Sequence, residues 1–113
     1  MALRLAKPWQ PLTAQSVARL PGQLGVYELA NDGGDTVGFG FAGARALFGL
    51  RSTLADIVAE PPHAATQYRV EVNTQYQTRF RELLMVYAAD HGKLPPVNAE
   101  APPINLGRLS PLS

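Results

Sequence analysis

Residues 24–41 read LGVYELANDGGDTVGFGF, two β-prone segments separated by a concentrated turn signal. The first segment is apolar around Tyr27, and residues 31–35 supply the Asn, Asp and Gly that favour tight turns. This pattern predicts a β-hairpin.

The returning segment of the hairpin alternates large apolar side chains with glycine. Val37, Phe39 and Phe41 are separated by Gly38 and Gly40. A period of two predicts that the three large side chains share one face of the strand. The glycines leave the other face without side chains, so a backbone, a packed ring or a ligand can approach it closely.

Downstream of the hairpin, three more elements are expected. Apolar residues at three- and four-residue spacing predict a helix over 44–58, and clean alternation predicts a half-exposed strand over 66–72. Thr74 opens a further helix with Gln77 as its capping-box partner, and Gly92 is well suited to end it. The apolar stripe of that helix consists of Tyr76, Phe80, Leu83, Leu84 and Tyr87.

The two ends of the chain differ from its centre. Residues 1–12 predict an extended N-terminal arm, in which Trp9 is a candidate partner-binding residue, with packing on its own domain as the favoured alternative. Thr13 can cap a short helix. From Lys93 onward the chain holds five of its ten prolines, which predicts an extended tail. The expected organisation is an arm at 1–12, a domain at 13–99 and a proline-rich tail at 100–113.

The expected order of elements is therefore α-β-β-α-β-α. A small three-stranded antiparallel sheet flanked by helices, an α+β fold, buries these apolar faces most simply.

Composition limits the function classes. A net charge of +1 gives no general attraction to nucleic acid or anionic lipid, and the absence of cysteine removes disulfides and thiolate sites. His63 and His91 are too few for a zinc site. No apolar run approaches a bilayer-spanning length, and charged residues and proline interrupt the N-terminus before a signal-peptide core forms. We therefore expect a cytoplasmic protein without membrane insertion.

With the hairpin placed, the chain resembles the GIY-YIG nuclease superfamily over residues 20–98. A Leu-Pro turn leads into Gly25-Val26-Tyr27, and ten residues separate Tyr27 from Gly38-Phe39-Gly40, as in that family. Glu82 stands on the later helix where the family places its metal-binding glutamate, and Asn98 stands where a loop asparagine commonly follows.

The resemblance implies a chemistry of phosphodiester cleavage with one divalent metal. It would assign Tyr27, Arg51 and Glu82 as catalytic residues, with Mg²⁺ held by Glu82. Arg45 is the other arginine available on the helix predicted over 44–58, and Arg51 is preferred because a small insertion would bring it into the family's position.

Two departures from the family pattern weaken the nuclease interpretation. Gly38 replaces a tyrosine, and Phe48 occupies the position where the arginine usually stands. We therefore expect a degenerate member without strong nuclease activity and with no resident cofactor. It would act as a binding or accessory subunit that reaches a protein partner through the N-terminal arm and C-terminal tail.

Two alternatives remain open from the sequence. One is an active, divergent Mg²⁺-dependent DNA or RNA endonuclease. The other is a nucleic-acid binder without chemistry, and its candidate contacts are Arg45, Arg69, Arg79 and Arg81. For Glu82 itself, the competing interpretation is a helix glutamate that is solvated or paired with a neighbouring arginine.

Overall fold

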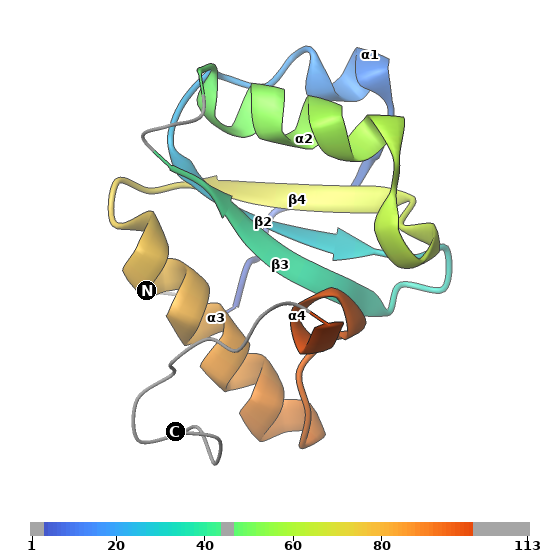
Figure 1. The fold of residues 1–113 in the computed structure, drawn as a ribbon, viewed down its shortest axis with the longest axis vertical. Helices are drawn as coiled ribbons and strands as arrows, with labels where there is room; N and C mark the ends of the chain where they lie inside the picture. The colour runs from blue at the N-terminus through green and yellow to red at the C-terminus, as the bar shows by residue number, and fades with distance from the viewer. Residues whose placement is uncertain (1–3, 44–46, 101–113) are drawn as a thin grey trace.

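The computed structural model describes residues 4–43 and 47–100 (Figure 1). The predicted α+β class is confirmed. In chain order the elements are β1 (Gln10–Pro11), α1 (Ala14–Val17), β2 (Gly25–Ala30), β3 (Thr36–Ala42), α2 (Gly49–Ala59), the 3-10 turn η1 (Pro62–Ala64), β4 (Gln67–Val72), α3 (Tyr76–His91) and α4 (Pro96–Glu100).

The sheet has four antiparallel strands in the order β1-β4-β2-β3, one more than predicted. The additional strand comes from the N-terminal segment, whose Gln10 pairs with Tyr68 of β4. A two-residue strand containing a proline has no alternation to detect and fits only at an edge. Leu5 and Leu12 on either side of it are buried, so this segment contributes to the core of the domain.

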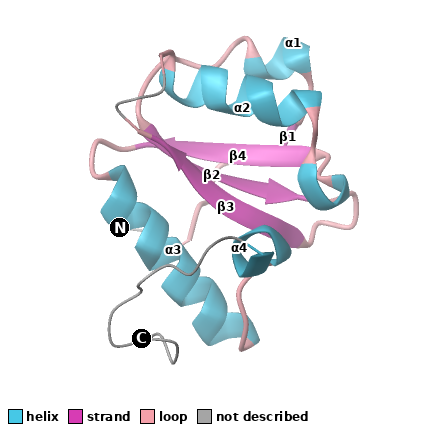
Figure 2. Cartoon of the chain, viewed as in Figure 1, coloured by secondary structure: helices cyan, strands magenta, loops and turns pink. Residues whose placement is uncertain are grey.

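Helices cover the sheet from both sides, as Figure 2 shows, with α1 and α2 on one side and α3 on the other. Two buried clusters correspond to these layers. The cluster on the α2 face includes Leu29, Leu50, Leu54 and Tyr68, whereas the cluster on the α3 face includes Val26, Phe39, Phe80, Leu83 and Leu84.

The predicted hairpin is confirmed, with Tyr27 of β2 opposite Gly40 of β3. The prediction that Val37 and Phe39 share a face was wrong. The register shifts between Leu29 and Ala30, so Val37 has no partner on β2. A bulge of this kind places an extra residue on one side of the strand. Val37 therefore joins the cluster on the α2 face, while Phe39 packs on the α3 face.

The two main helices begin later than predicted. Helix α2 begins at Gly49, whose φ is 55°, and residues 44–46 lie outside the described part of the chain. The start of α3 is Tyr76 rather than Thr74, and no capping box forms. Just before the helix, Asn73 Oδ1 accepts a hydrogen bond from the Gln75 backbone N–H. Gly92 ends α3 in the left-handed conformation, as predicted.

The last element, α4, lies within the stretch expected to be extended. Its five residues follow Pro95, and the Asn98 side chain makes two bonds to β3, a strand at the edge of the sheet. Asn98 Oδ1 accepts from the Phe39 N–H at 2.9 Å, and Asn98 Nδ2 donates to the Phe39 carbonyl at 3.0 Å. The side-chain amide thus supplies both hydrogen bonds that a neighbouring strand would make.

Within the described ranges, no helix combines the length and apolar character that crossing a membrane requires.

Candidate functional site

Tyr27, the first candidate catalytic residue, is a packed strand residue on the α2 face. Its ring lies against Gly40, where an added Cβ would stand only 2.2 Å from the tyrosine hydroxyl. The expectation that bare glycine backbone admits a packed ring is therefore confirmed at Gly40. Burial raises the pKa of Tyr27 to about 12, which makes its phenolate a costly form near neutral pH.

Arg51, the second candidate, belongs to α2 and lies on the same side of the sheet. Its guanidinium carbon is 5.1 Å from the centroid of the Phe48 ring, a cation–π contact. Arg45, its alternative, lies outside the described residues.

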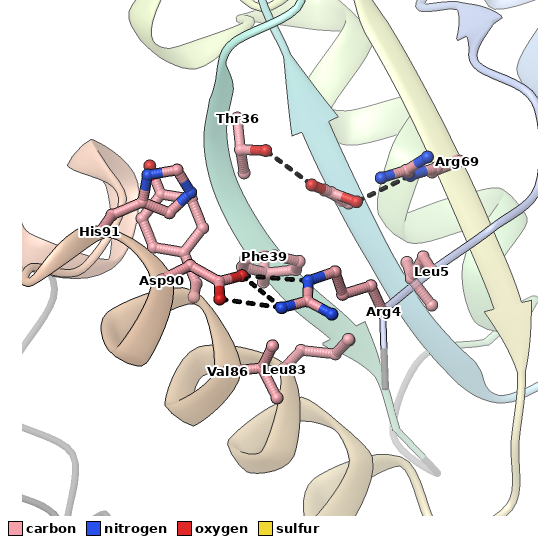
Figure 3. Close-up of a pocket in the computed structure, with 11 residues that line it drawn as sticks. Arg4, Leu5, Thr36, Phe39, Arg69, Leu83, Val86, Asp90 and His91 are labelled. Carbon is pink, nitrogen blue, oxygen red and sulfur yellow. Dashed lines mark hydrogen bonds and ion pairs between the residues drawn. The ribbon is translucent and has the colours of Figure 1, made fainter. Parts of the chain in front are cut away.

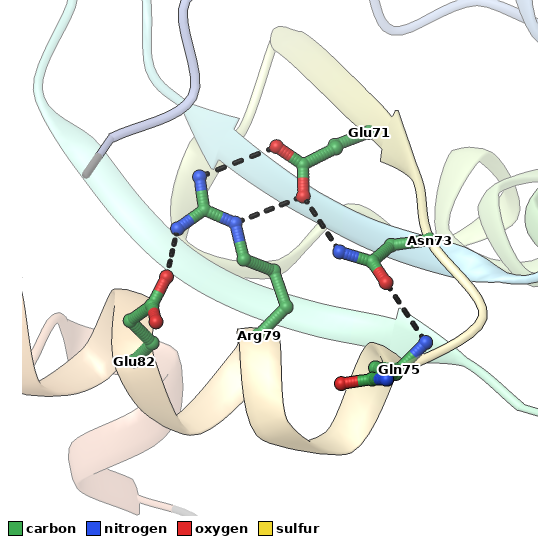
Figure 4. Close-up of polar contacts among 5 residues, drawn as sticks. All are labelled: Glu71, Asn73, Gln75, Arg79 and Glu82. Carbon is green, nitrogen blue, oxygen red and sulfur yellow. Dashed lines mark hydrogen bonds and ion pairs between the residues drawn. The ribbon is translucent and has the colours of Figure 1, made fainter. Parts of the chain in front are cut away.

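Glu82, the candidate metal ligand, is on α3 and takes part in an ion-pair network (Figure 4). Its Oε1 accepts a hydrogen bond from Nη1 of Arg79, whose side chain is only 4% exposed. Arg79 also donates from Nε and Nη2 to Glu71 of β4, at 2.9 and 3.2 Å. The network ties α3 to the sheet, in agreement with the interpretation of Glu82 as a paired helix glutamate.

The network also affects the pKa of Glu71. Burial opposes the ionisation of Glu71, but hydrogen bonds from Arg79 and Asn73 and the positive charges of Arg79 and Lys7 outweigh it. The pKa of Glu71 is consequently lowered. Both carboxylates thus accept hydrogen bonds from the same arginine.

The sheet separates the three candidate catalytic residues. Tyr27 and Arg51 lie on the side of α2, and Glu82 lies on the side of α3 (Figure 1). Among the described residues, no group of three or more His, Asp or Glu side chains could hold a metal ion. The structure therefore does not bring together the residues that the resemblance assigns to catalysis.

The candidate nucleic-acid contacts are also dispersed. Arg79 is buried between its two carboxylates, and Arg69 pairs with Glu28 on the sheet. Arg81 is exposed on α3. Trp9 packs on its own domain, because the Arg69 guanidinium carbon lies 4.2 Å from the centroid of the Trp9 rings.

A cavity of about 190 Å³ lies between α3, the sheet and the N-terminal segment (Figure 3). Its most unusual residue is Glu28, a carboxylate with a side chain only 6% exposed. Glu28 Oε1 accepts from Arg69 Nε at 2.7 Å, and Oε2 accepts from the Thr36 hydroxyl at 2.6 Å. These partners offset the cost of burying the charge.

The opposite side of the cavity is formed by the end of α3 and the N-terminal segment. Arg4 donates from Nε and Nη2 to both carboxylate oxygens of Asp90, at 2.8 to 3.0 Å. The Tyr87 and His91 rings stack with centroids 4.1 Å apart. Burial raises the pKa of Tyr87, and the negative charges of Asp35 and Glu28 add to the effect. The cavity is thus polar at both ends.

Sequence reasoning did not single out Glu28, Thr36 or Arg4. The available signal was Glu28 itself, the one charged residue in the otherwise apolar segment 24–30. A carboxylate on a strand with both faces covered requires a cationic partner from another element. Which arginine supplies it depends on the pairing of β2 with β4, which places Arg69 opposite Glu28.

These features define the class of protein: a small α+β domain with a four-stranded antiparallel sheet between helices and a polar cavity beneath one of them. The chain belongs to the family described as domain of unknown function DUF7508, which it matches over residues 3–90. No curated protein and no solved structure shows a significant match to it.

Proposed function

We propose that this chain is a degenerate GIY-YIG-like domain that works as a non-catalytic binding or accessory subunit of a larger assembly. The observation that carries the proposal is the placement of Glu82. It is paired with Arg79 on the α3 side of the sheet, while Tyr27 and Arg51 lie on the α2 side. Metal-assisted cleavage needs these groups around one phosphate.

The chemistry of each group supports the same conclusion. A hard divalent cation needs several oxygen ligands, and Glu82 and Glu71 are both engaged by one arginine. A tyrosine that helps to deprotonate water needs an accessible hydroxyl with a pKa near the working pH. Burial instead raises the pKa of Tyr27, away from neutral pH.

The surface features favour a protein as the partner. Among the described residues, the exposed large hydrophobic side chains are Phe41, Leu47, Phe48 and Val72. They come from the ends of β3 and β4 and from the two residues before α2, and the first turn of α2 is hydrogen-bonded to the Gln23 carbonyl at the same end of the sheet. We call these four residues the apolar end. Exposed apolar groups gathered at one end of a small domain are typical of a protein-binding surface.

The apolar end replaces the N-terminal arm as our preferred docking surface. Leu5 and Leu12 are buried, and Trp9 contacts Arg69, so the N-terminal segment is used by its own domain. The C-terminal tail from residue 101 onward lies outside the described residues, and its role in docking stays a prediction.

The catalytic part of the proposal is tested by plasmid nicking with Mg²⁺ and then Mn²⁺. We expect no cleavage above background from the full chain, and the same from Glu82→Gln. Metal-dependent nicking by the unmodified chain that disappears in Glu82→Gln would instead establish a divergent endonuclease. Circular dichroism of both proteins confirms that each is folded.

The binding part is tested with the double variant Leu47→Ser and Phe48→Ser. These side chains are exposed, so the free energy of unfolding should change by less than about 0.5 kcal/mol. We expect the double variant to lose a stoichiometric protein partner that the unmodified chain retains through purification from its native cells. Equal recovery with Lys93→Ser, a matched exposed change elsewhere, is the control, and retention by the double variant would contradict this surface.

A further inference from the structure

The cavity under α3 holds arginine donors that the protein itself does not use. Arg69 donates from Nε to Glu28 and stacks on Trp9, and its side chain is 20% exposed. Its two Nη groups have no acceptor among the described residues. A guanidinium fixed by one bond and one stacking contact is held in place while its outer N–H groups stay available.

The two carboxylates of the cavity, in contrast, are already engaged. Both oxygens of Glu28 accept hydrogen bonds, from Arg69 and Thr36, and both oxygens of Asp90 accept from Arg4. In the described part of the chain, no buried side-chain nitrogen or oxygen lacks a partner. The spare Nη groups are therefore not sealed in the core, and Arg69 is one of the residues that line the cavity.

The other wall supplies further donors. Arg4 uses Nε and Nη2 on Asp90 and makes no bond from Nη1 to the described residues. The Tyr87 hydroxyl and the His91 ring also line the cavity and are held by stacking. The cavity thus has an excess of hydrogen-bond donors, two of them cationic.

We propose that this cavity binds a small molecule through an oxyanion, a carboxylate or a phosphate group, placed between the guanidinium groups of Arg69 and Arg4. Each arginine is held by its own carboxylate, so little ordering remains to be done when the anion arrives. Leu5, Phe39 and Leu83 line the same space and provide an apolar contact for the rest of the ligand. A volume of about 190 Å³ suits a molecule below drug size rather than an oligonucleotide.

Trp9 gives a direct readout, because it is the one tryptophan of the chain and it touches Arg69. Its emission would be followed while the full chain is titrated with inorganic phosphate and, separately, with propionate. Sodium chloride at matched ionic strength corrects for general screening. We expect a saturable change that chloride does not produce, and the anion that produces it identifies the ligand group as a phosphate or a carboxylate.

Two variants and one control make the test specific. Arg69→Lys keeps a charge beside Glu28 but removes the free Nη fork, and we expect at least tenfold weaker binding. Arg4→Gln alters an exposed ion pair, so the fold should survive, and binding should weaken several-fold. Arg19→Gln removes an exposed charge near α1 and should bind like the unmodified chain.

Three results would overturn the proposal. The first is the absence of a saturable response to either anion up to about 20 mM, beyond the millimolar range of weak specific sites. The second is unchanged binding in both Arg69→Lys and Arg4→Gln. The third is an equal loss in Arg19→Gln, which would mean that the response follows net charge. None of these outcomes depends on whether the chain cleaves nucleic acid.

Discussion

The two faces of the sheet carry different kinds of side chain. On the α2 face, Leu29, Leu50 and Leu54 form an aliphatic layer in which the hydroxyl of Tyr68 is hydrogen-bonded to Ser16. On the α3 face, apolar residues share the space with two ion pairs that each have one buried member, Glu28 with Arg69 and Arg79 with Glu71.

The difference indicates where stability and function reside. Burying apolar surface stabilises a fold directly, whereas a buried ion pair costs desolvation energy that its attraction barely repays. We therefore expect the α2 face to contribute more to the stability of the domain than the α3 face. The α3 face keeps charges and a cavity that stability alone does not require, and we propose that it serves binding.

The largest effect is expected from truncating a buried leucine on the α2 face, which creates a void in the core. Leu54 is fully buried, so Leu54→Ala should lower the free energy of unfolding by about 2–5 kcal/mol. Leu83→Ala on the α3 face should cost less, because side chains beside an existing cavity can relax into it. Urea denaturation followed by circular dichroism measures both. A larger cost for Leu83→Ala would remove the distinction between the faces.

An intermediate effect is expected from the buried arginine of the α3 face. Arg79→Met should cost about 2 kcal/mol, below the 3–5 kcal/mol of a fully buried pair, because Glu71 and Glu82 are partly exposed. Adding Glu71→Gln should recover part of the loss, since the uncompensated charge beside the sheet is then gone. Arg81→Met, an exposed change on the same helix, is the control and should stay within about 0.5 kcal/mol. Loss of equal size in the control would show that the network does not matter.

The secondary structure could be predicted where the signal is local. The hairpin follows from turn residues between β-prone segments, and α3 follows from its apolar stripe and Gly92. The signal failed where a partner lies far along the chain. Strand β1 exists because β4 pairs with it, and α4 because Asn98 reaches Phe39, 59 residues away.

The site was harder to predict for the same reason. Glu82 was noticed through a family pattern, yet its neighbourhood is decided by Arg79 reaching across to Glu71 of β4. The cavity depends on Arg4 and Asp90, which are 86 residues apart. Spacing within one helix predicts the contact of Arg79 with Glu82 and nothing of the contacts between elements.

The smallest effect is a difference between two tyrosine titrations. The pKa of Tyr27, on the α2 face, is raised by burial alone, to about 12, whereas for Tyr87, on the α3 face, Asp35 and Glu28 add to burial. Both shifts favour the folded state below pH 10, and this stabilisation is lost as the pH rises through the folded-state pKa.

Absorbance of the phenolate, compared with Tyr27→Phe and Tyr87→Phe, assigns each titration. Added salt should lower the pKa of Tyr87, because it screens the carboxylates, and should leave that of Tyr27 nearly unchanged. The same salt response of both pKa values would contradict the contrast between an apolar α2 face and a charged α3 face.

The two bonds from Asn98 to Phe39 also affect whether β3 can pair with a second molecule. Residue 98 lies beyond the segment 3–90 that matches the family, so a chain shortened at residue 90 would retain that whole segment without this side chain. The backbone groups of Phe39 would then be an open template for another strand, and edge-to-edge pairing is a common route to aggregation. By occupying both backbone groups of Phe39, this one amide side chain fills the place where a second molecule could otherwise add a strand.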